Sequence, residues 1–101
     1  MIEGLVAGRI WSSAEHRVDK AGRPYCVAKI RVTGTDSEGI LVNLIAFDPA
    51  VCDSLFLVRE GDAISVSGAI TPKVWTDKQG NTKPAIDMVA HRVLHLGESQ
   101  N

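Results

Sequence analysis

Cations and aromatic rings occur close together in separate stretches of this chain. Tyr25 stands shortly before Lys29 and Arg31, and Trp75 lies between Lys73 and Lys78. Cations neutralise phosphates and rings stack on bases of any sequence, so this mixture is typical of surfaces that bind single-stranded nucleic acid. The candidate contact residues are Arg9, Trp11, Arg17, Lys20, Arg23, Tyr25, Lys29, Arg31, Asn43, Phe47, Lys73, Trp75, Lys78 and Lys83.

The charge of the chain is unevenly distributed although its formal net value is only −1. Residues 9–31 carry six cations and two acids, and residues 73–83 carry three cations and one acid. Residues 36–62 carry six acids and one cation. If the two basic segments meet in space, the molecule has one cationic side that can face a polyanion.

The sequence contains no recognisable arrangement for catalysis. We find no carboxylate pair, activated serine or cysteine, or phosphate-binding glycine loop, and therefore expect neither an enzyme nor a bound cofactor. His91 and His95 fall in a predicted strand, where four residues span about 13 Å, too far to share a metal ion. Cys26 and Cys52 form no CxxC pair and stand among apolar neighbours, which predicts buried, reduced thiols.

Length and composition predict one domain. The 101 residues are 45% hydrophobic, enough for one modest core, and we assign 1–101 to a single domain with a short tail at 97–101. No repeat or linker interrupts it. No apolar run is long enough to span a membrane and no signal segment opens the chain, which favours a cytoplasmic location.

The first half of the chain alternates as strands do. Residues 2–11 predict a first strand, followed by a polar loop over 12–23. Residues 25–32 and 40–47 predict a hairpin around a turn at 34–39. The glycines of the first strand are interpreted as bends or sites of close backbone approach.

Alternation also divides inward from outward side chains in the predicted hairpin. The inward rows are Cys26, Ala28, Ile30 and Val32 on one strand and Val42, Leu44 and Ala46 on the other. The outward rows are Tyr25, Val27, Lys29 and Arg31, and Leu41, Asn43, Ile45 and Phe47. An outward row with three apolar members requires a partner, either a ligand or another subunit.

The second half begins with a helix signal. Asp48 can cap the free amides and Pro49 suits the first helical position, and Gly61 is expected to end the helix. Further strands are expected at 63–71 and 86–96, on either side of a polar segment at 72–84.

This order of elements is that of the OB-fold. The sequence therefore predicts an all-β, five-stranded Greek-key barrel with one short helix between strands 3 and 4. Such barrels bind oligonucleotides or oligosaccharides through strands 2–3 and through the loops that join strands 1–2 and 4–5. In this chain those are the segments that carry the positive charge.

Several stretches resemble the bacterial single-stranded DNA-binding protein family. They are residues 7–10, 45–47, 60–62, 67–68 and 74–77, together with Arg17, Gly22 and Gly80. The resemblance implies a protein that coats single-stranded DNA without strong sequence preference during replication, recombination or repair. It also implies a dimer or tetramer with other replication proteins as partners, and leaves a preference for DNA or RNA open.

Departures from the family pattern leave alternatives open. Leu41 stands where the family carries an aromatic ring, and a second ring expected around 34–39 is missing. The chain ends at Asn101 without the glycine-rich linker and acidic tip of the family. The alternatives are a dimeric adaptor in replication restart, like primosomal replication protein B, and an OB barrel that binds only protein.

The first strand also predicts self-association. Ile2, Leu5 and Val6 are apolar residues on a strand whose edge is expected to be exposed. An exposed edge can be buried against a copy of itself, so we expect at least a homodimer through strand 1.

Overall fold

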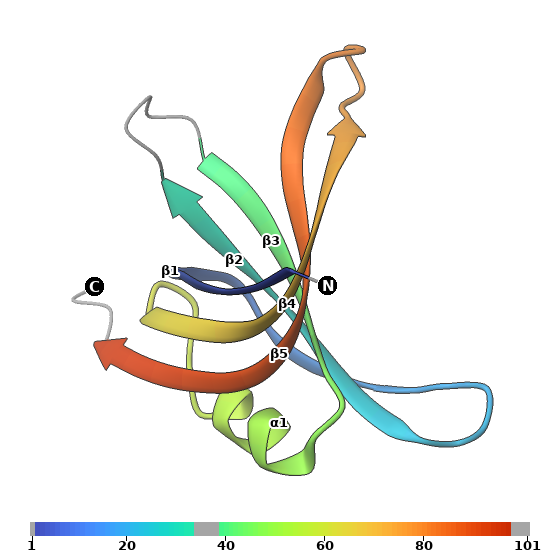
Figure 1. Cartoon of the computed structure of the whole chain (residues 1–101), viewed down its shortest axis with the longest axis vertical. Coiled ribbons are helices and arrows are strands. Elements are labelled where there is room, and N and C mark those ends of the chain that lie inside the picture. The colour runs from blue at the N-terminus through green and yellow to red at the C-terminus, as the bar shows by residue number, and fades with distance from the viewer. Residues whose placement is uncertain (1, 34–38, 98–101) are drawn as a thin grey trace.

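The computed structural model describes residues 2–33 and 39–97. These residues form a five-stranded barrel with one helix, as expected for an OB-fold (Figure 1). The elements are β1 (Ile2–Val18), β2 (Pro24–Thr33), β3 (Gly39–Ala46), α1 (Pro49–Phe56), β4 (Ala63–Thr76) and β5 (Thr82–Gly97). All but Gly39 of the predicted turn at 34–39, and all but Gly97 of the predicted tail at 97–101, lie outside the described residues.

The strands close in the order β1-β2-β3-β5-β4, with β3 and β5 parallel and the other neighbours antiparallel. The long strand β1 closes the barrel between β4 and β2, because its first half pairs with β4 and its second half pairs with β2. Gly8 lies near this change of partner. A Cβ there would come within 2.6 Å of the Arg31 carbonyl oxygen, so the glycine provides the close backbone approach expected from the sequence.

Two strand boundaries differ from the sequence predictions. The expected loop at 12–23 is wrong over 12–18, which continue β1, and the expected polar segment at 72–84 is mostly the paired ends of β4 and β5. Both segments are two-stranded arms that extend away from the barrel (Figure 1). Their residues are largely exposed on both faces, so hydrophobic alternation carries no signal for them.

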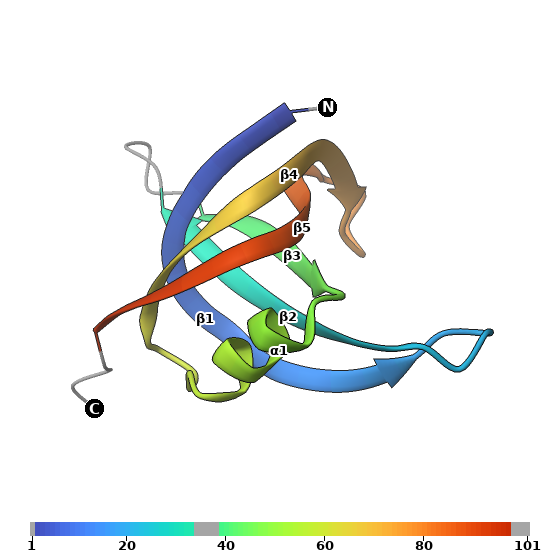
Figure 2. The same ribbon diagram turned by 60° about the horizontal axis from the view of Figure 1, so that its bottom comes forward.

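Helix α1 begins where the sequence predicts and ends earlier. The Asp48 carboxylate accepts a hydrogen bond from the Ala50 N–H at 2.8 Å, and proline occupies the first turn. The helix ends at Phe56, not at Gly61, which instead has φ 89° in the turn that leads into β4. Buried Val51 and Leu55 hold the helix against one end of the barrel (Figure 2).

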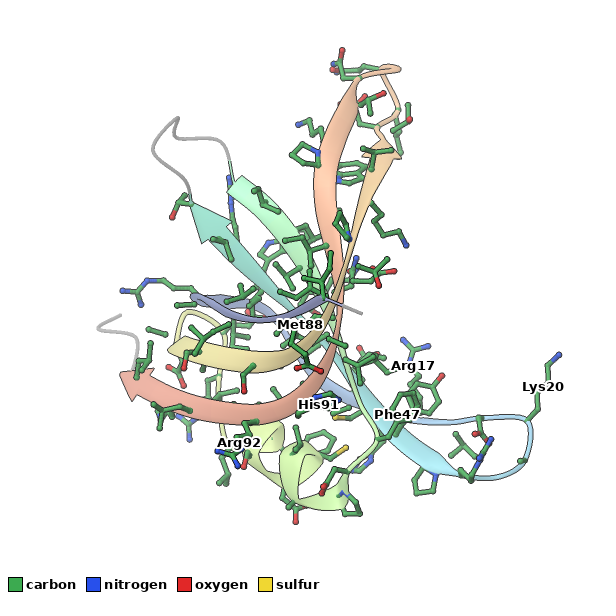
Figure 3. The ribbon with its side chains drawn as sticks, in the orientation of Figure 1. Arg17, Lys20, Phe47, Met88, His91 and Arg92 are labelled. Atoms are coloured by element: carbon green, nitrogen blue, oxygen red, sulfur yellow. The ribbon has the colours of Figure 1, made fainter. Side chains whose placement is uncertain are left out.

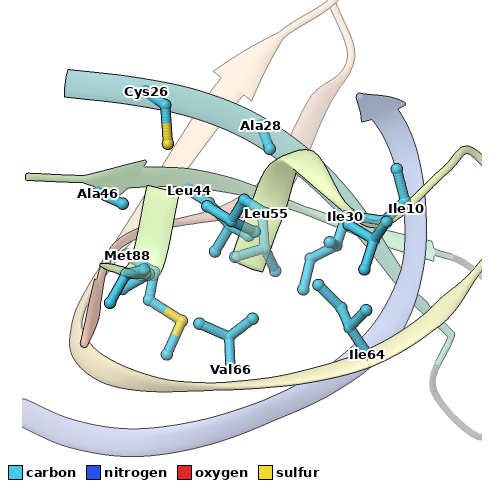
Figure 4. Close-up of a cluster of buried hydrophobic side chains, with 14 residues drawn as sticks. Ile10, Cys26, Ala28, Ile30, Leu44, Ala46, Leu55, Ile64, Val66 and Met88 are labelled. Atoms are coloured by element: carbon cyan, nitrogen blue, oxygen red, sulfur yellow. The ribbon is translucent and has the colours of Figure 1, made fainter. Parts of the chain in front are cut away.

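The core lies inside the barrel and confirms the predicted inward rows (Figure 4). Val42, Leu44 and Ala46 of β3 are buried. The inward row of β2 is buried as well, except for Val32, which is half-buried. Burial and the adjacent Cys52 thiol raise the pKa of Cys26 to about 12. The Cys26 thiol is therefore protonated at neutral pH, while Cys52 is only half-buried and donates to the Ala46 carbonyl at 3.3 Å.

Candidate nucleic-acid interface

The outward rows of β2 and β3 lie side by side and form one continuous surface. Cross-strand register pairs Arg31 with Leu41, Lys29 with Asn43, and Val27 with Ile45. Residues opposite each other on paired strands point to the same face. We call this surface and the hollows along it the β2–β3 groove.

One end of the groove contains both tryptophans. Trp11 and Trp75 line a single hollow of about 250 Å³ with Arg31, Leu41 and Lys83. The Lys83 ammonium lies 5.9 Å from the Trp75 ring centre, and the Lys29 ammonium lies 6.0 Å from the Trp11 ring centre. Each indole thus has a cation within the distance of a cation–π contact. Residues Trp11 and Trp75 are 56% and 40% exposed, which leaves surface available to a planar ligand.

The middle of the groove is a wider hollow of about 450 Å³. Its floor is formed by the β2–β3 pairs, including Lys29 opposite Asn43, and its walls come from β1 and β5. Arg17 lies on the β1 side and Asp87 on the β5 side. Cations, an amide and apolar side chains therefore meet within one hollow.

The other end of the groove carries a second aromatic group. Tyr25 and Phe47 have ring centres 5.9 Å apart and line a small hollow with His16. Phe47 is 57% exposed, and its ring neighbour Tyr25 pairs across the strands with Arg17 at the base of the β1–β2 arm; Figure 3 labels Phe47 and Arg17. His16 stacks in turn on Phe56 of α1, with ring centres 4.2 Å apart. Rings therefore stand at both ends of the groove.

The turn between β4 and β5 fixes the strand that carries Trp75. The Asp77 carboxylate accepts hydrogen bonds from the N–H groups of Asn81 and Gln79, each at 2.9 Å. These bonds, the one from Asn81 foremost, lower the pKa of Asp77. Gly80 supplies the positive φ of 84° that the turn requires. Trp75 is then held opposite Lys83 in the paired strands.

Ion pairs reduce the number of cations that can meet phosphates. Arg17 pairs with Glu15 at 3.0 Å, Arg23 with Asp19 at 2.9 Å, and Lys73 with Asp87 at 2.8 Å. Within the described part of the chain, Lys29, Arg31 and Lys83 form no ion pair. These last three cations line the groove. Arg31 belongs to the basic segment 9–31 and Lys83 to the basic segment 73–83, and both residues line the hollow that contains the tryptophans.

Other predicted contact residues lie outside the groove. Arg9 lies opposite Arg31 in the β1–β2 register, donates a hydrogen bond to the Gly61 carbonyl at 2.8 Å, and shares with Arg31 a further hollow beside the groove. Lys20 and Arg23 belong to the turn of the β1–β2 arm, with Lys20 near its tip (Figure 3). Lys78 lies in the exposed turn between β4 and β5. These residues extend positive charge along the arms but do not build the hollows.

The structure adds polar residues to the middle hollow that the sequence prediction missed, and Asp87 is the one that contacts a predicted residue of β3. Asp87 of β5 lies beside Asn43 because β3 and β5 are parallel neighbours. The Asn43 amide donates to Asp87 Oδ1 at 3.2 Å, and the Lys73 ammonium donates to Oδ2 at 2.8 Å. Asp87 precedes buried Met88 in β5, so alternation predicts that its side chain points outward. Only the pairing of β5 with β3 shows that Asp87 lies beside the groove.

The histidines considered as metal ligands lie apart from the groove and contact acids instead. His91 Nδ1 is 3.8 Å from Glu3 Oε2, and His95 Nε2 is 3.3 Å from Asp62 Oδ2. The described residues contain no cluster of three or more His, Cys, Asp or Glu side chains suited to a metal ion. Nor do they include a helix long and apolar enough to cross a membrane.

Comparison with solved structures gives the same barrel over nearly the full chain. The mitochondrial single-stranded DNA-binding protein of S. cerevisiae is 17% identical, with 97% of each chain covered and a TM-score of 0.75. The small single-stranded DNA-binding protein of Streptomyces coelicolor is 16% identical, with 94% of each chain covered and a TM-score of 0.72. The chain has the fold of the single-stranded DNA-binding proteins.

A third structure extends the comparison to a complex. The Plasmodium falciparum single-stranded DNA-binding protein bound to single-stranded DNA is 13% identical, with 95% of each chain covered and a TM-score of 0.68. No family model and no curated protein sequence matches this chain. The family resemblance inferred from short motifs is thus confirmed as a likeness of fold.

Proposed function

We propose that this chain binds single-stranded DNA along the β2–β3 groove without strong sequence preference. The observation that carries the proposal is the continuity of the groove, which has rings at both ends and cations between them. Trp11 and Trp75 stand at one end, and Tyr25 and Phe47 at the other. Rings stack on any base and cations follow the phosphates, which is how single-strand binders accept many sequences.

The dimensions of the groove suit a short stretch of extended strand. From Tyr25 to Arg31 the β2 backbone advances about 20 Å at the usual rise per residue. The two arms prolong this surface with further cations, including Lys20 and Lys78. A single OB barrel in other proteins covers about 4–16 nucleotides, and the groove together with its arms fits this range.

The setting of this activity follows from its ligand. Single strands of DNA become exposed during replication, recombination and repair, and a protein that coats them without reading sequence acts on such intermediates. We therefore place the role of the chain in these processes. The three solved structures compared above are described as single-stranded DNA-binding proteins, which supports the assignment.

The direct test is a titration with oligo-dT followed by tryptophan fluorescence at several salt concentrations. Both tryptophans line one hollow, so a base that enters it should quench the emission strongly. Quenching that saturates at low salt and weakens as salt rises supports the proposal. Unchanged emission, together with no shift in the anisotropy of labelled oligo-dT, would instead favour a barrel that binds only protein.

The salt dependence should identify the cations that meet the DNA. Replacing Lys29 and Arg31 together with alanine should lower the slope of log affinity against log salt by about 1 to 1.5, because each released counterion contributes about 0.7 for single strands. Both cations line the groove and form no ion pair within the described residues. The measurement is the oligo-dT dissociation constant at four or more salt concentrations.

A matched control removes two cations elsewhere. Arg59 and Arg92 are exposed and line none of the hollows along the groove. The Arg59→Ala and Arg92→Ala double variant should retain the wild-type slope. Equal slopes in wild type and in the Lys29 and Arg31 variant would show that the DNA takes another path.

We also propose a homodimer through β1. Residues 2–9 of β1 pair with β4, whereas pairing with β2 begins only at Arg9, so the first part of β1 has one strand edge without a partner in the described chain. Ile2 and Leu5 on this part are 55% and 68% exposed. Pairing with a second copy would cover both the edge and these side chains.

Light scattering at micromolar concentration should give about twice the chain mass of 10.9 kDa. Leu5→Glu should return the mass toward that of one chain, because a charge would then be buried in the contact. Circular dichroism of this variant should remain that of the folded barrel. A monomeric mass for the wild type would contradict the proposed dimer.

A further inference from the structure

Two carboxylates, Glu15 and Asp87, line the middle hollow of the groove. Glu15 is paired with Arg17 of the same strand, whereas Asp87 lies beside Asn43 of β3. Asp87 lines the middle hollow, together with Lys29 and Asn43. A carboxylate repels phosphates, so at this position it weakens the attraction on which single-strand binding depends. The position of Asp87 therefore implies a function other than attraction of the phosphate backbone of the DNA.

The contacts of Asp87 hold its carboxylate in a fixed orientation. Asn43 donates to Oδ1 at 3.2 Å and Lys73 donates to Oδ2 at 2.8 Å, so each oxygen has one partner from a different strand. An ionised carboxylate has about four acceptor sites, so further donors can be accommodated. The side chain is 45% exposed, and a ligand in the hollow can reach it.

The chemistry of the bases makes such an acceptor selective. Cytosine carries an N4 amino group, which donates hydrogen bonds, whereas thymine and uracil carry an O4 carbonyl, which only accepts them. A carboxylate accepts from the first group and is repelled by the second. Acidic side chains that contact C N4 are a known form of base readout.

We propose that Asp87, positioned by Asn43 and Lys73, makes the β2–β3 groove prefer bases with an exocyclic amino group over thymine or uracil at the central position of the bound strand. This inference rests on the proposed single-strand binding and adds a local preference to it. The ion pair with Lys73 offsets the charge of Asp87 toward phosphates, so the groove keeps its general affinity. The rings at its two ends remain indifferent to sequence.

The test compares oligo-dC with oligo-dU of the same length, about 15 nucleotides, which is within the range that one OB barrel covers. These bases differ at the C4 substituent and at N3, which carries a proton only in uracil, so the ratio of their dissociation constants reports on this edge of the base and the Asp87→Asn variant assigns the difference to Asp87. Both are measured by anisotropy at one salt concentration and at pH 7.5 to 8, where cytosine is unprotonated. We expect wild type to bind oligo-dC about 3- to 10-fold more tightly, the range of one net hydrogen bond.

Asp87→Asn keeps the shape of the side chain and adds an amide donor that can meet O4. The oligo-dC to oligo-dU preference should fall to about 1 or reverse, although loss of the negative charge should tighten binding to both. The matched control is Glu15→Gln, which neutralises another carboxylate of the same hollow that is paired with a cation, Arg17. This control should change both affinities equally and retain the wild-type preference.

Each outcome has a distinct meaning. A preference that is present in wild type and Glu15→Gln but lost in Asp87→Asn supports the inference. Equal wild-type affinities for the two oligonucleotides, or a preference that survives in Asp87→Asn, overturn it while leaving single-strand binding intact. Failure of wild type to bind either oligonucleotide at low salt overturns the proposed function itself.

Discussion

Replacing Trp75 with alanine should weaken oligo-dT binding about 5- to 150-fold, because stacking contributes about 1–3 kcal/mol per base. The Trp75 ring lines the hollow that also contains Trp11 and Arg31, and 40% of the residue surface is exposed. It lies near the end of β4, in the β4–β5 arm, and is not among the core residues. The midpoint of thermal unfolding should therefore change little. Anisotropy of labelled oligo-dT measures the affinity, and circular dichroism measures the stability.

Two variants on the same surface complete this experiment. Val74→Ala truncates the neighbouring side chain, which is 67% exposed and lines none of the hollows along the groove, and should bind as wild type does. Phe47→Ala should lose less affinity than Trp75→Ala, since its ring also packs on Tyr25. If Trp75→Ala bound normally and melted much earlier, the ring would serve the fold or a subunit contact, and the tryptophan hollow would not be a base site.

Replacing Gly68 with alanine should destabilise the barrel by about 3 kcal/mol or more, a large effect for one methyl group. Gly68 is buried in β4, where its pairing with β5 shifts register between Ser67 and Gly68. A Cβ at this position would overlap the carbonyl oxygen of Val89 on the neighbouring strand. Since the obstacle is backbone of the closed barrel, relief requires that β4 and β5 separate.

The free energy of unfolding is measured by urea denaturation followed by circular dichroism. Gly97→Ala is the matched control, because a Cβ at Gly97 meets no atom within 4 Å. This control should stay within about 0.5 kcal/mol of wild type, as most surface substitutions do. If Gly68→Ala were as stable as Gly97→Ala, the close contact between β4 and β5 would not constrain the barrel.

Local patterns in the sequence were sufficient for the barrel wall and the helix start. In 40–47 every second residue is apolar and inward, so burial of Val42, Leu44 and Ala46 follows from strand geometry alone. The start of α1 follows from Asp48 and Pro49, whose capping chemistry acts within one turn. The same alternation predicts the outward row with Lys29 and Arg31, so the sequence alone identifies these two residues as candidate DNA contacts.

The lengths of the arms were beyond the reach of such patterns. Residues 12–18 and the ends of β4 and β5 are held by hydrogen bonds between paired backbones while both faces meet solvent. Alternation reports burial on one face, and here neither face is buried. The polar composition therefore predicts a loop, although pairing between the strands makes these residues strand.

The kind of chemistry on the surface follows from the amino-acid sequence, because cations and rings are properties of residues. Which of them meet depends on the fold. Closure of the barrel brings Trp11 of β1 to Trp75 of β4, and parallel pairing of β3 with β5 brings Asp87 to Asn43. Ion pairs then reduce the set of cations that can meet phosphates, since Lys73 is paired with Asp87. These outcomes depend on contacts between residues far apart in the chain, which a local pattern of hydrophobicity or charge does not encode.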